Sequence, residues 1–198
     1  MTFRDVLVLS AVACSHDPVE LGDSGRSPST DPSTSVPDSV DPTAPIASTS
    51  VACDACGGDC VLDTLSYAYR YHDEADIDYS DPPPAGGPHD PCWAAFGVHD
   101  EPVPDDNWVH NLEHGAVVLL SDCTDCDADR AALAEIATDR PFVLVTPYSG
   151  MPKPFAAVAW GVRMLTGCVD PEAIVAFHDA HVDQGPESLA AGPPDDCM

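Results

Sequence analysis

The sequence predicts an α+β domain with a small mixed β-sheet and two main helices, and three observations support this class. Apolar runs typical of buried strands alternate with amphipathic helical segments from residue 116 onward. A front loop rich in proline and glycine, residues 82–104, precedes them and excludes regular structure there. Nine cysteines among 198 residues indicate a fold stapled by disulfides.

The chain is strongly acidic, with 34 Asp and Glu against 7 Lys and Arg and a formal net charge of -27. Such a charge repels a phosphate backbone and an anionic membrane surface, so nucleic-acid binding is excluded. We expect most of these carboxylates to form a solvated surface and not a site.

The first 14 residues resemble a bacterial lipoprotein signal. Arg4 precedes an apolar run that ends on small residues directly before Cys14. The run is too short to span a bilayer permanently. We therefore expect export, lipid modification of Cys14 and an anchored position in the bacterial cell envelope, either periplasmic or facing the surface.

The next segment, residues 15–50, consists mainly of Ser, Thr, Pro and Asp. It has too few large apolar side chains to offset the entropy of ordering, so we expect a disordered tether. Residues 51–198 then form a single folded domain, which is long enough for one core.

Eight cysteines remain in this domain, and an even number in an exported protein predicts up to four disulfides. They are Cys53, Cys56, Cys60, Cys92, Cys123, Cys126, Cys168 and Cys197. Their pairing is not fixed by the sequence. A four-thiolate zinc site from the two C-x-x-C pairs is the alternative, and an oxidising compartment disfavours it. Redox catalysis is disfavoured because neither pair is expected to follow a buried strand and open a long helix.

Tyrosines alternate over Leu65–His72, which predicts a half-buried strand, and residues 77–79 are a second short candidate. The front loop follows. Asp105, Asp106 and Asn107 are N-cap residue types, and Gly115 is a usual stop, so we expect a short helix between them. Residues 116–120 read as a core strand.

The remaining elements follow from periodicity and caps. We expect a helix over 127–138, buried strands over 142–146 and 155–161, and a helix that starts at Asp170-Pro171-Glu172 and reaches about His181. The C-terminal tail is expected to be held by Cys197.

The expected short helix carries the strongest candidate site. His110 and His114, at positions i and i+4, would share one face with Glu113 beside them. In a strand the two histidines would sit about 13 Å apart, four rises of roughly 3.3 Å, and could not bind one ion. The helix therefore predicts a metal site.

We expect His89, in the rigid front loop, to be the third ligand, and Met151 or Glu113 to complete the set. Neutral imidazoles suit zinc or copper(II), and a thioether would shift the preference toward copper(I). The cofactor expected is therefore copper or zinc.

Two alternatives stay open. His110-x-x-Glu113-His114 matches the H-x-x-E-H motif of zinc hydrolases with Glu113 as general base, although Gly115 would end the helix early. Otherwise the domain is a non-catalytic, disulfide-braced envelope binding protein, in which the histidines bond backbone and Glu113 forms a cap or pairs with Arg163. His72, His99, His178 and His181, the other histidines of the folded domain, are expected to be surface or core residues.

Several spaced motifs between about Tyr67 and Glu187 resemble one family. They are Pro82-Pro83-Pro84-x-Gly86-Gly87-Pro88-His89, Trp93-x-x-Phe96-Gly97-Val98, Val109-His110-Asn111-Leu112-Glu113-His114-Gly115, Thr146-Pro147-Tyr148 and Ala159-Trp160-Gly161. Together they resemble the domain-of-unknown-function 3105 family of secreted and lipid-anchored bacterial proteins, in a cysteine-rich version. The resemblance implies one fold unit and an exported location, and it supplies no reaction.

Overall fold

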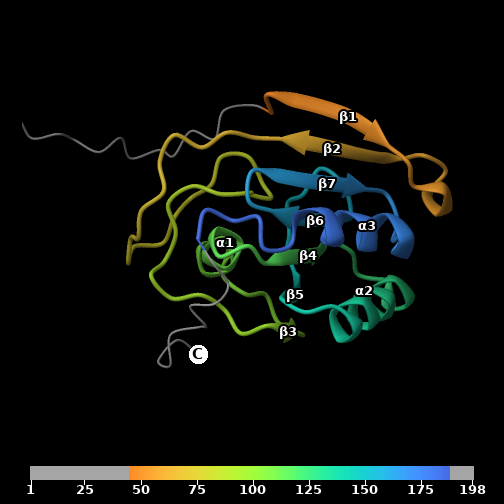
Figure 1. Cartoon of the computed structure of the whole chain (residues 1–198). Helices are drawn as coiled ribbons and strands as arrows, with labels where there is room; N and C mark the ends of the chain where they lie inside the picture. The colour runs from red at the N-terminus through yellow and green to blue at the C-terminus, as the bar shows by residue number, and fades with distance from the viewer. Residues whose placement is uncertain (1–44, 188–198) are drawn as a thin grey trace, which may run out of the picture. The chain divides into compact units, whose positions relative to one another are not determined.

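Seven strands form one mixed sheet in the computed structural model, which describes residues 45–187 (Figure 1). The strands are β1 (Ala47–Val51), β2 (Cys60–Thr64), β3 (Gly97–Val98), β4 (Val117–Ser121), β5 (Val143–Pro147), β6 (Phe155–Ala159) and β7 (Val162–Thr166). Their order is β1-β2-β7-β6-β4-β5-β3, so β1 and β3 are the edges. β5 is parallel to β4 and β3, and the other pairs are antiparallel.

Three α-helices accompany the sheet: α1 (Asp105–Glu113), α2 (Asp127–Asp139) and α3 (Pro171–His181). A 3-10 turn, η1 (Asp54–Cys56), joins β1 to β2. α2 connects β4 to the parallel β5 and completes a β-α-β unit. Among the described residues, no helix combines the length and the apolar character that crossing a membrane requires.

The two faces of the sheet carry separate apolar clusters, because successive strand residues point to opposite sides. Val117 and Leu119 belong to one cluster with side chains of α2 and α3, and we call that side the α2/α3 face. Val118 and Leu120 belong to the other, together with side chains of α1 and the front loop, and we call that side the α1 face.

The predicted α+β class and the mixed sheet are confirmed. The predicted helix over 127–138 is α2, the strand over 142–146 is β5, and the helix starting at Asp170 is α3. The Asp170 carboxylate accepts the backbone N–H groups of Glu172 and Ala173 as an N-cap.

α1 and β4 are found where they were predicted, but the N-cap of α1 differs. Pro104 occupies the N-cap without a side-chain hydrogen bond, and Asp105 and Asp106 lie in the first turn. Gly115 follows with a φ of 90°, and a Cβ there would lie 2.7 Å from the Asp183 Cα. Only glycine fits this position, which explains why the helix ends here.

The strand predicted over Leu65–His72 is wrong, because β2 ends at Thr64 and an irregular segment follows. The tyrosines do not share a buried face, since Tyr69 is 65% exposed. Tyr67 instead accepts the Ala85 N–H through its hydroxyl at 2.9 Å. The second candidate, residues 77–79, is also irregular, and the Tyr79 hydroxyl donates to the Pro88 carbonyl at 2.6 Å. Tyr67 and Tyr79 therefore hold the front loop in place through hydrogen bonds of their hydroxyls.

Four strands were not predicted: β1, β2, β3 and β7. β1 begins at Ala47, inside the segment expected to be a tether, and it pairs with β2 along an exposed edge. β6 ends at Ala159, and the chain returns as β7 from Val162, so the run 155–161 is a strand and a turn. The predicted signal segment 1–14, most of the tether and Cys197 lie outside the described residues.

Three disulfides are present in the described residues: Cys53–Cys60, Cys56–Cys168 and Cys123–Cys126. Cys92 is disulfide-bonded as well. The C-x-x-C pairs therefore do not form a common four-thiolate zinc site. One expectation is wrong: Cys123 and Cys126 do follow a buried strand, β4, and precede the 13-residue helix α2.

Candidate metal centre

Four side chains converge on the α1 face: His72, His89, His110 and Glu113. Each offers one ligand atom, and these atoms all lie within 4.8 Å of one another. They come from three separate segments, because only His110 and Glu113 share an element. We call this group the metal centre.

α1 supplies two of the four groups because positions i and i+3 of a helix lie on one face. His110 and Glu113 are both buried, at 4% exposure each. Burial is imposed by the packing of the same helix, since Trp108, Val109 and Leu112 are fully enclosed in the apolar cluster of the α1 face.

The front loop delivers His89, and Arg163 on β7 holds that loop in place. The guanidinium donates to the carbonyls of Asp81 and Pro83, both at 2.9 Å. It also pairs with the carboxylates of Asp63 and Asp81. A charged group with this many partners fixes the loop more firmly than apolar contacts alone.

His72 is placed by backbone pairing with the loop. His72 and His89 form an isolated parallel bridge. The His89 N–H donates to the Tyr71 carbonyl at 3.1 Å, and the Asp73 N–H donates to the His89 carbonyl at 2.9 Å. The His72 and His89 ring centroids are therefore 5.0 Å apart.

The hydrogen bonds of two histidines fix which nitrogen is available. His89 Nδ1 lies 2.9 Å from the Gly87 carbonyl, and His110 Nδ1 lies 2.8 Å from the Asp90 carbonyl. A carbonyl only accepts, so each Nδ1 carries the hydrogen and each Nε2 presents a lone pair. Metal-binding histidines are oriented in this way by their second nitrogen.

The contact between His89 and Glu113 lacks a positive charge. His89 Nε2 is fully buried and has no hydrogen-bond partner, although Glu113 Oε2 lies 2.9 Å from it. With the hydrogen on Nδ1, a lone pair of nitrogen faces a carboxylate oxygen, which is unfavourable without a proton or a cation between them. A metal ion at this position would satisfy both atoms.

Burial keeps these imidazoles neutral. Burial is the main reason that the pKa of His110 is lowered to about 3, and the neighbouring His89 contributes to the same lowering. Burial also lowers the pKa of His89, against the opposing effects of the Gly87 carbonyl and Glu113. Both rings are therefore available as neutral ligands near pH 7 without losing a proton.

The surroundings give the centre a closed side and an open side. Trp160 meets the His89 ring edge to face at a centroid distance of 6.1 Å, and Trp93 stacks on His110 at 5.7 Å. The His72 side chain is 52% exposed. An ion would therefore enter on the side of His72.

His114 lies beside the centre and is not one of the four. Its Nε2 is 3.1 Å from His110 Nε2, and because His110 holds its hydrogen on Nδ1, His114 is the donor. His114 groups instead with Glu113 and Glu187. Arg70 lies between these two carboxylates, 3.3 Å from Glu113 Oε1 and 4.0 Å from Glu187 Oε1.

Of the predicted ligands, the structure brings His89, His110 and Glu113 together and places His114 next to them. Met151 follows β5, where its N–H donates to the Asp122 carboxylate and its side chain packs against the apolar cluster of the α1 face. Its role as a ligand stays a prediction.

His72 was missed, because a single histidine at the end of an alternating run gives no ligand signal. The alternative that pairs Glu113 with Arg163 is wrong. Arg163 is held by Asp63 and Asp81, while Glu113 contacts Arg70 and His89. The two charged networks share no residue.

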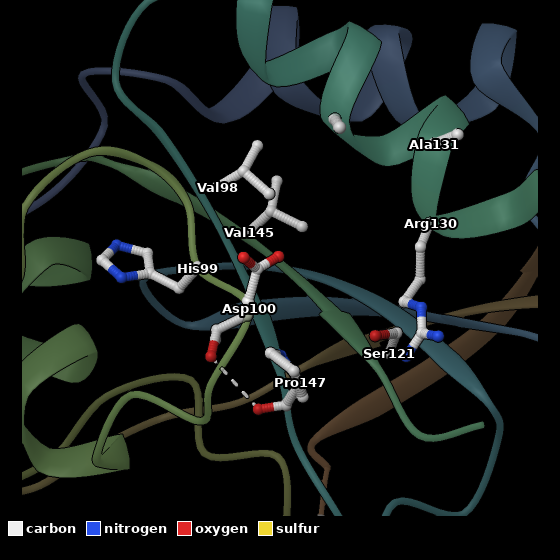
Figure 2. A pocket seen from close by; sticks show the side chains of 10 residues that line it. Val98, His99, Asp100, Ser121, Arg130, Ala131, Val145 and Pro147 are labelled. Carbon is white, nitrogen blue, oxygen red and sulfur yellow. Dashed lines mark hydrogen bonds between the residues drawn. The ribbon is translucent and has the colours of Figure 1, made fainter. Parts of the chain in front are cut away.

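A pocket of about 380 Å³ lies apart from the metal centre, at the carboxyl ends of β3, β4 and β5 (Figure 2). Its lining includes His99, Asp100, Ser121, Arg130 and Pro147. None of the four residues of the metal centre lines it.

The comparisons with known proteins give a family and no activity. No curated protein matches the sequence, and no solved structure does. The model of the family described as "Protein of unknown function (DUF3105)" matches residues 71–193, which include all four residues of the metal centre. This span is more than half of the chain, so the chain belongs to the DUF3105 family.

Proposed function

We propose that this domain binds one transition-metal ion, zinc or copper(II), through His72, His89, His110 and Glu113. The observation that carries the proposal is the convergence of four ligand atoms within 4.8 Å, from three segments of the chain. The Nε2 atoms of His89 and His110 are both unprotonated, and His110 would exchange the hydrogen bond from His114 for the ion.

The donor set selects the class of metal. Three imidazoles and one carboxylate are borderline ligands that suit zinc and copper(II), whereas calcium and magnesium prefer oxygen alone. The buried contact between His89 Nε2 and Glu113 Oε2 is the part of the site that most needs a cation. If Met151 joined the set, copper(I) would be favoured instead.

Two observations favour metal binding over the alternative function, hydrolysis through the H-x-x-E-H motif. As a general base, Glu113 would need an oxygen directed at a water molecule. Here Oε1 pairs with Arg70 and Oε2 faces His89. α1 also ends at Glu113, so the motif does not lie within a sustained helix.

The test is a metal titration of the disulfide-intact chain, purified without chelator or affinity metal. Zinc and copper(II) are added separately, and uptake is followed by calorimetry and elemental analysis. We expect one equivalent per chain. A chain that takes up neither metal would overturn the proposal and favour a non-catalytic binding role.

Single variants assign the ligands. His89→Ala and Glu113→Gln should each weaken binding by at least about 100-fold, because each changes a ligand itself, and losing only a hydrogen-bond partner of a ligand already costs about 10- to 100-fold. His99→Ala is the control, since His99 lines the separate pocket. His114→Ala should weaken binding less than about tenfold. If His114→Ala and His110→Ala weakened metal binding equally, the ion would be held by His110 and His114, the pair predicted from the sequence.

We also propose that the domain acts in the cell envelope, anchored through a lipid on Cys14. The disulfides of the folded domain are consistent with an oxidising compartment. Labelling with a fatty-acid analogue, followed by membrane fractionation, tests this in the producing bacterium. The Cys14→Ser variant should lose both the label and the membrane association. An unlabelled native chain would contradict the anchor.

A further inference from the structure

We propose a second activity, separate from the metal centre: the Cys123–Cys126 disulfide undergoes thiol–disulfide exchange with an external dithiol. The pair lies between β4 and α2, inside the β-α-β unit that β4, α2 and β5 form. A disulfide between a buried strand and a helix is supported by a regular element on each side.

The size of its loop argues against a purely structural role. The two cysteines are 3 residues apart, whereas Cys56 and Cys168 are 112 apart. A disulfide stabilises a fold mainly by restricting the unfolded chain, and this effect grows with loop length. Cys123–Cys126 therefore contributes the smallest restriction of the disulfides whose pairing is described, and reducing it should leave the domain folded.

The two sulfur atoms differ in access. Cys123 is half-buried, while Cys126 is 9% exposed and packs with the apolar cluster of the α2/α3 face. An incoming thiolate therefore reaches Cys123 first, and Cys126 is the leaving group.

The position of Cys126 favours its departure as a thiolate. Cys126 is the N-cap of α2, where the partial positive charge of the 13-residue helix stabilises an anion. Acidic side chains near Cys126 oppose this stabilisation of the thiolate, but three of them already accept hydrogen bonds or pair with a cation. Asp122 accepts the N–H groups of Gly150 and Met151, Asp127 pairs with Arg130, and Asp129 accepts the Val169 N–H.

The pocket described above flanks the motif. Ser121 precedes Cys123 by two residues and Arg130 follows Cys126 by four, and both line the pocket. Figure 2 shows the Arg130 side chain extending from α2 toward Ser121 at the end of β4. The chain carries a formal charge of -27. We therefore expect a neutral or cationic dithiol to react faster than an anionic thiol.

The exchange is balanced in two steps. A thiolate of the dithiol attacks Cys123 Sγ, the Cys123–Cys126 bond breaks, and its electron pair leaves on Cys126 Sγ. The second thiolate of the dithiol then attacks its own sulfur in the mixed disulfide and releases Cys123. The dithiol loses two electrons and becomes a disulfide, and the two cysteines gain them and take up two protons. The reduced protein returns the electrons to another disulfide by the reverse path.

The test uses the intact chain in buffers with graded ratios of reduced to oxidised dithiothreitol. Samples are quenched with acid, alkylated and digested, and mass spectrometry reports which cysteines were reduced. We expect half-reduction of Cys123–Cys126 at a ratio at least about tenfold lower than for Cys56–Cys168, which is the internal control. Reduction of both pairs at one ratio would overturn the proposal.

Two variants test the order of attack. Cys126→Ser should leave a Cys123 thiol that forms a mixed disulfide with oxidised dithiothreitol or glutathione. Cys123→Ser should react at least about tenfold more slowly, because Cys126 is buried. Thr124→Ala is the matched control within the motif. Equal rates, or a faster Cys126, would contradict the assignment.

Discussion

The two faces of the sheet are built in different ways. On the α2/α3 face, the cluster consists of apolar side chains such as Leu133, Ile174 and Phe177, and two helices cover it. On the α1 face, a 9-residue helix and the front loop cover the sheet, and buried polar groups lie among the apolar ones. These include His89 and His110 of the metal centre and Arg163.

The two faces differ because a helix and an irregular loop satisfy their backbone hydrogen-bonding groups in different ways. A helix bonds its own N–H and C=O groups, so its buried side can be apolar. An irregular loop cannot, and it needs side chains as partners. Asn111 bonds both backbone groups of Ala94 at 2.9 Å, and Thr146 accepts the Val103 N–H at 2.9 Å. Two residues of α1 and β5 thus replace the hydrogen bonds that the loop lacks.

The polar face is therefore a suitable place for a site. Its loop is fixed by many directed bonds, and the ligand atoms are held before any ion arrives. The apolar face supplies stability and no chemistry of this kind. Four predictions test this division, ordered by the expected loss of stability.

The largest effect is expected for Arg163→Met on the α1 face. This substitution leaves the Asp63 carboxylate buried at 5% exposure without its cation and releases the carbonyls of Asp81 and Pro83. Removing one partner of such a network costs about 3–5 kcal/mol. Urea unfolding measures the loss, and weaker metal binding should accompany it because the loop carries His89. Arg130→Met, at an exposed ion pair, is the control.

A similar loss of about 2–5 kcal/mol is expected for Leu133→Ala on the α2/α3 face, because Leu133 is fully buried. Here the folded protein should bind metal as the native chain does. Glu135→Ala on the exposed side of α2 is the control. A fall in metal affinity as large as in Arg163→Met would show that the two faces are not independent.

Acid should weaken the α1 face next. The pKa of His110 is lowered from 6.5 to about 3 by burial, so the unfolded chain binds the proton more readily than the folded one. The contribution of neutral His110 to the free energy of unfolding is complete above pH 6.5. It is lost as the pH falls toward 3, at about 1.4 kcal/mol per pH unit. Urea unfolding of the metal-free chain between pH 7 and 4 measures this slope. The His110→Asn variant should lose the part of the pH dependence that His110 causes. An unchanged slope in this variant would contradict the assignment.

The smallest effect, about 1 kcal/mol, is expected for Asp170→Ala on the α2/α3 face. The carboxylate caps α3 and also accepts the Ala55 N–H at 2.9 Å. Asp170→Asn should recover most of the loss, since an asparagine also caps a helix. Thermal unfolding of the two variants provides the comparison, and equal losses would indicate that charge, not capping, is important.

The sequence by itself determined the locally coded elements. α2, α3, β4 and β5 follow from periodicity and caps within a dozen residues, and His110 and Glu113 meet because α1 puts positions i and i+3 on one face. The front loop was also recognisable, since proline and glycine disfavour regular structure, although Gly97 and Val98 within it form the short edge strand β3.

Only the tertiary structure decided what depends on distant partners. β1 and β7 both pair with β2, from opposite sides, and the disulfide partner of Cys56 lies 112 residues away. His72 joins the metal centre through backbone bonds to the loop that carries His89. His114 lies on the predicted helix face, yet its neighbours place it with Glu187. Such contacts are not visible in a local pattern, because their free energy arises only when separate segments pack together.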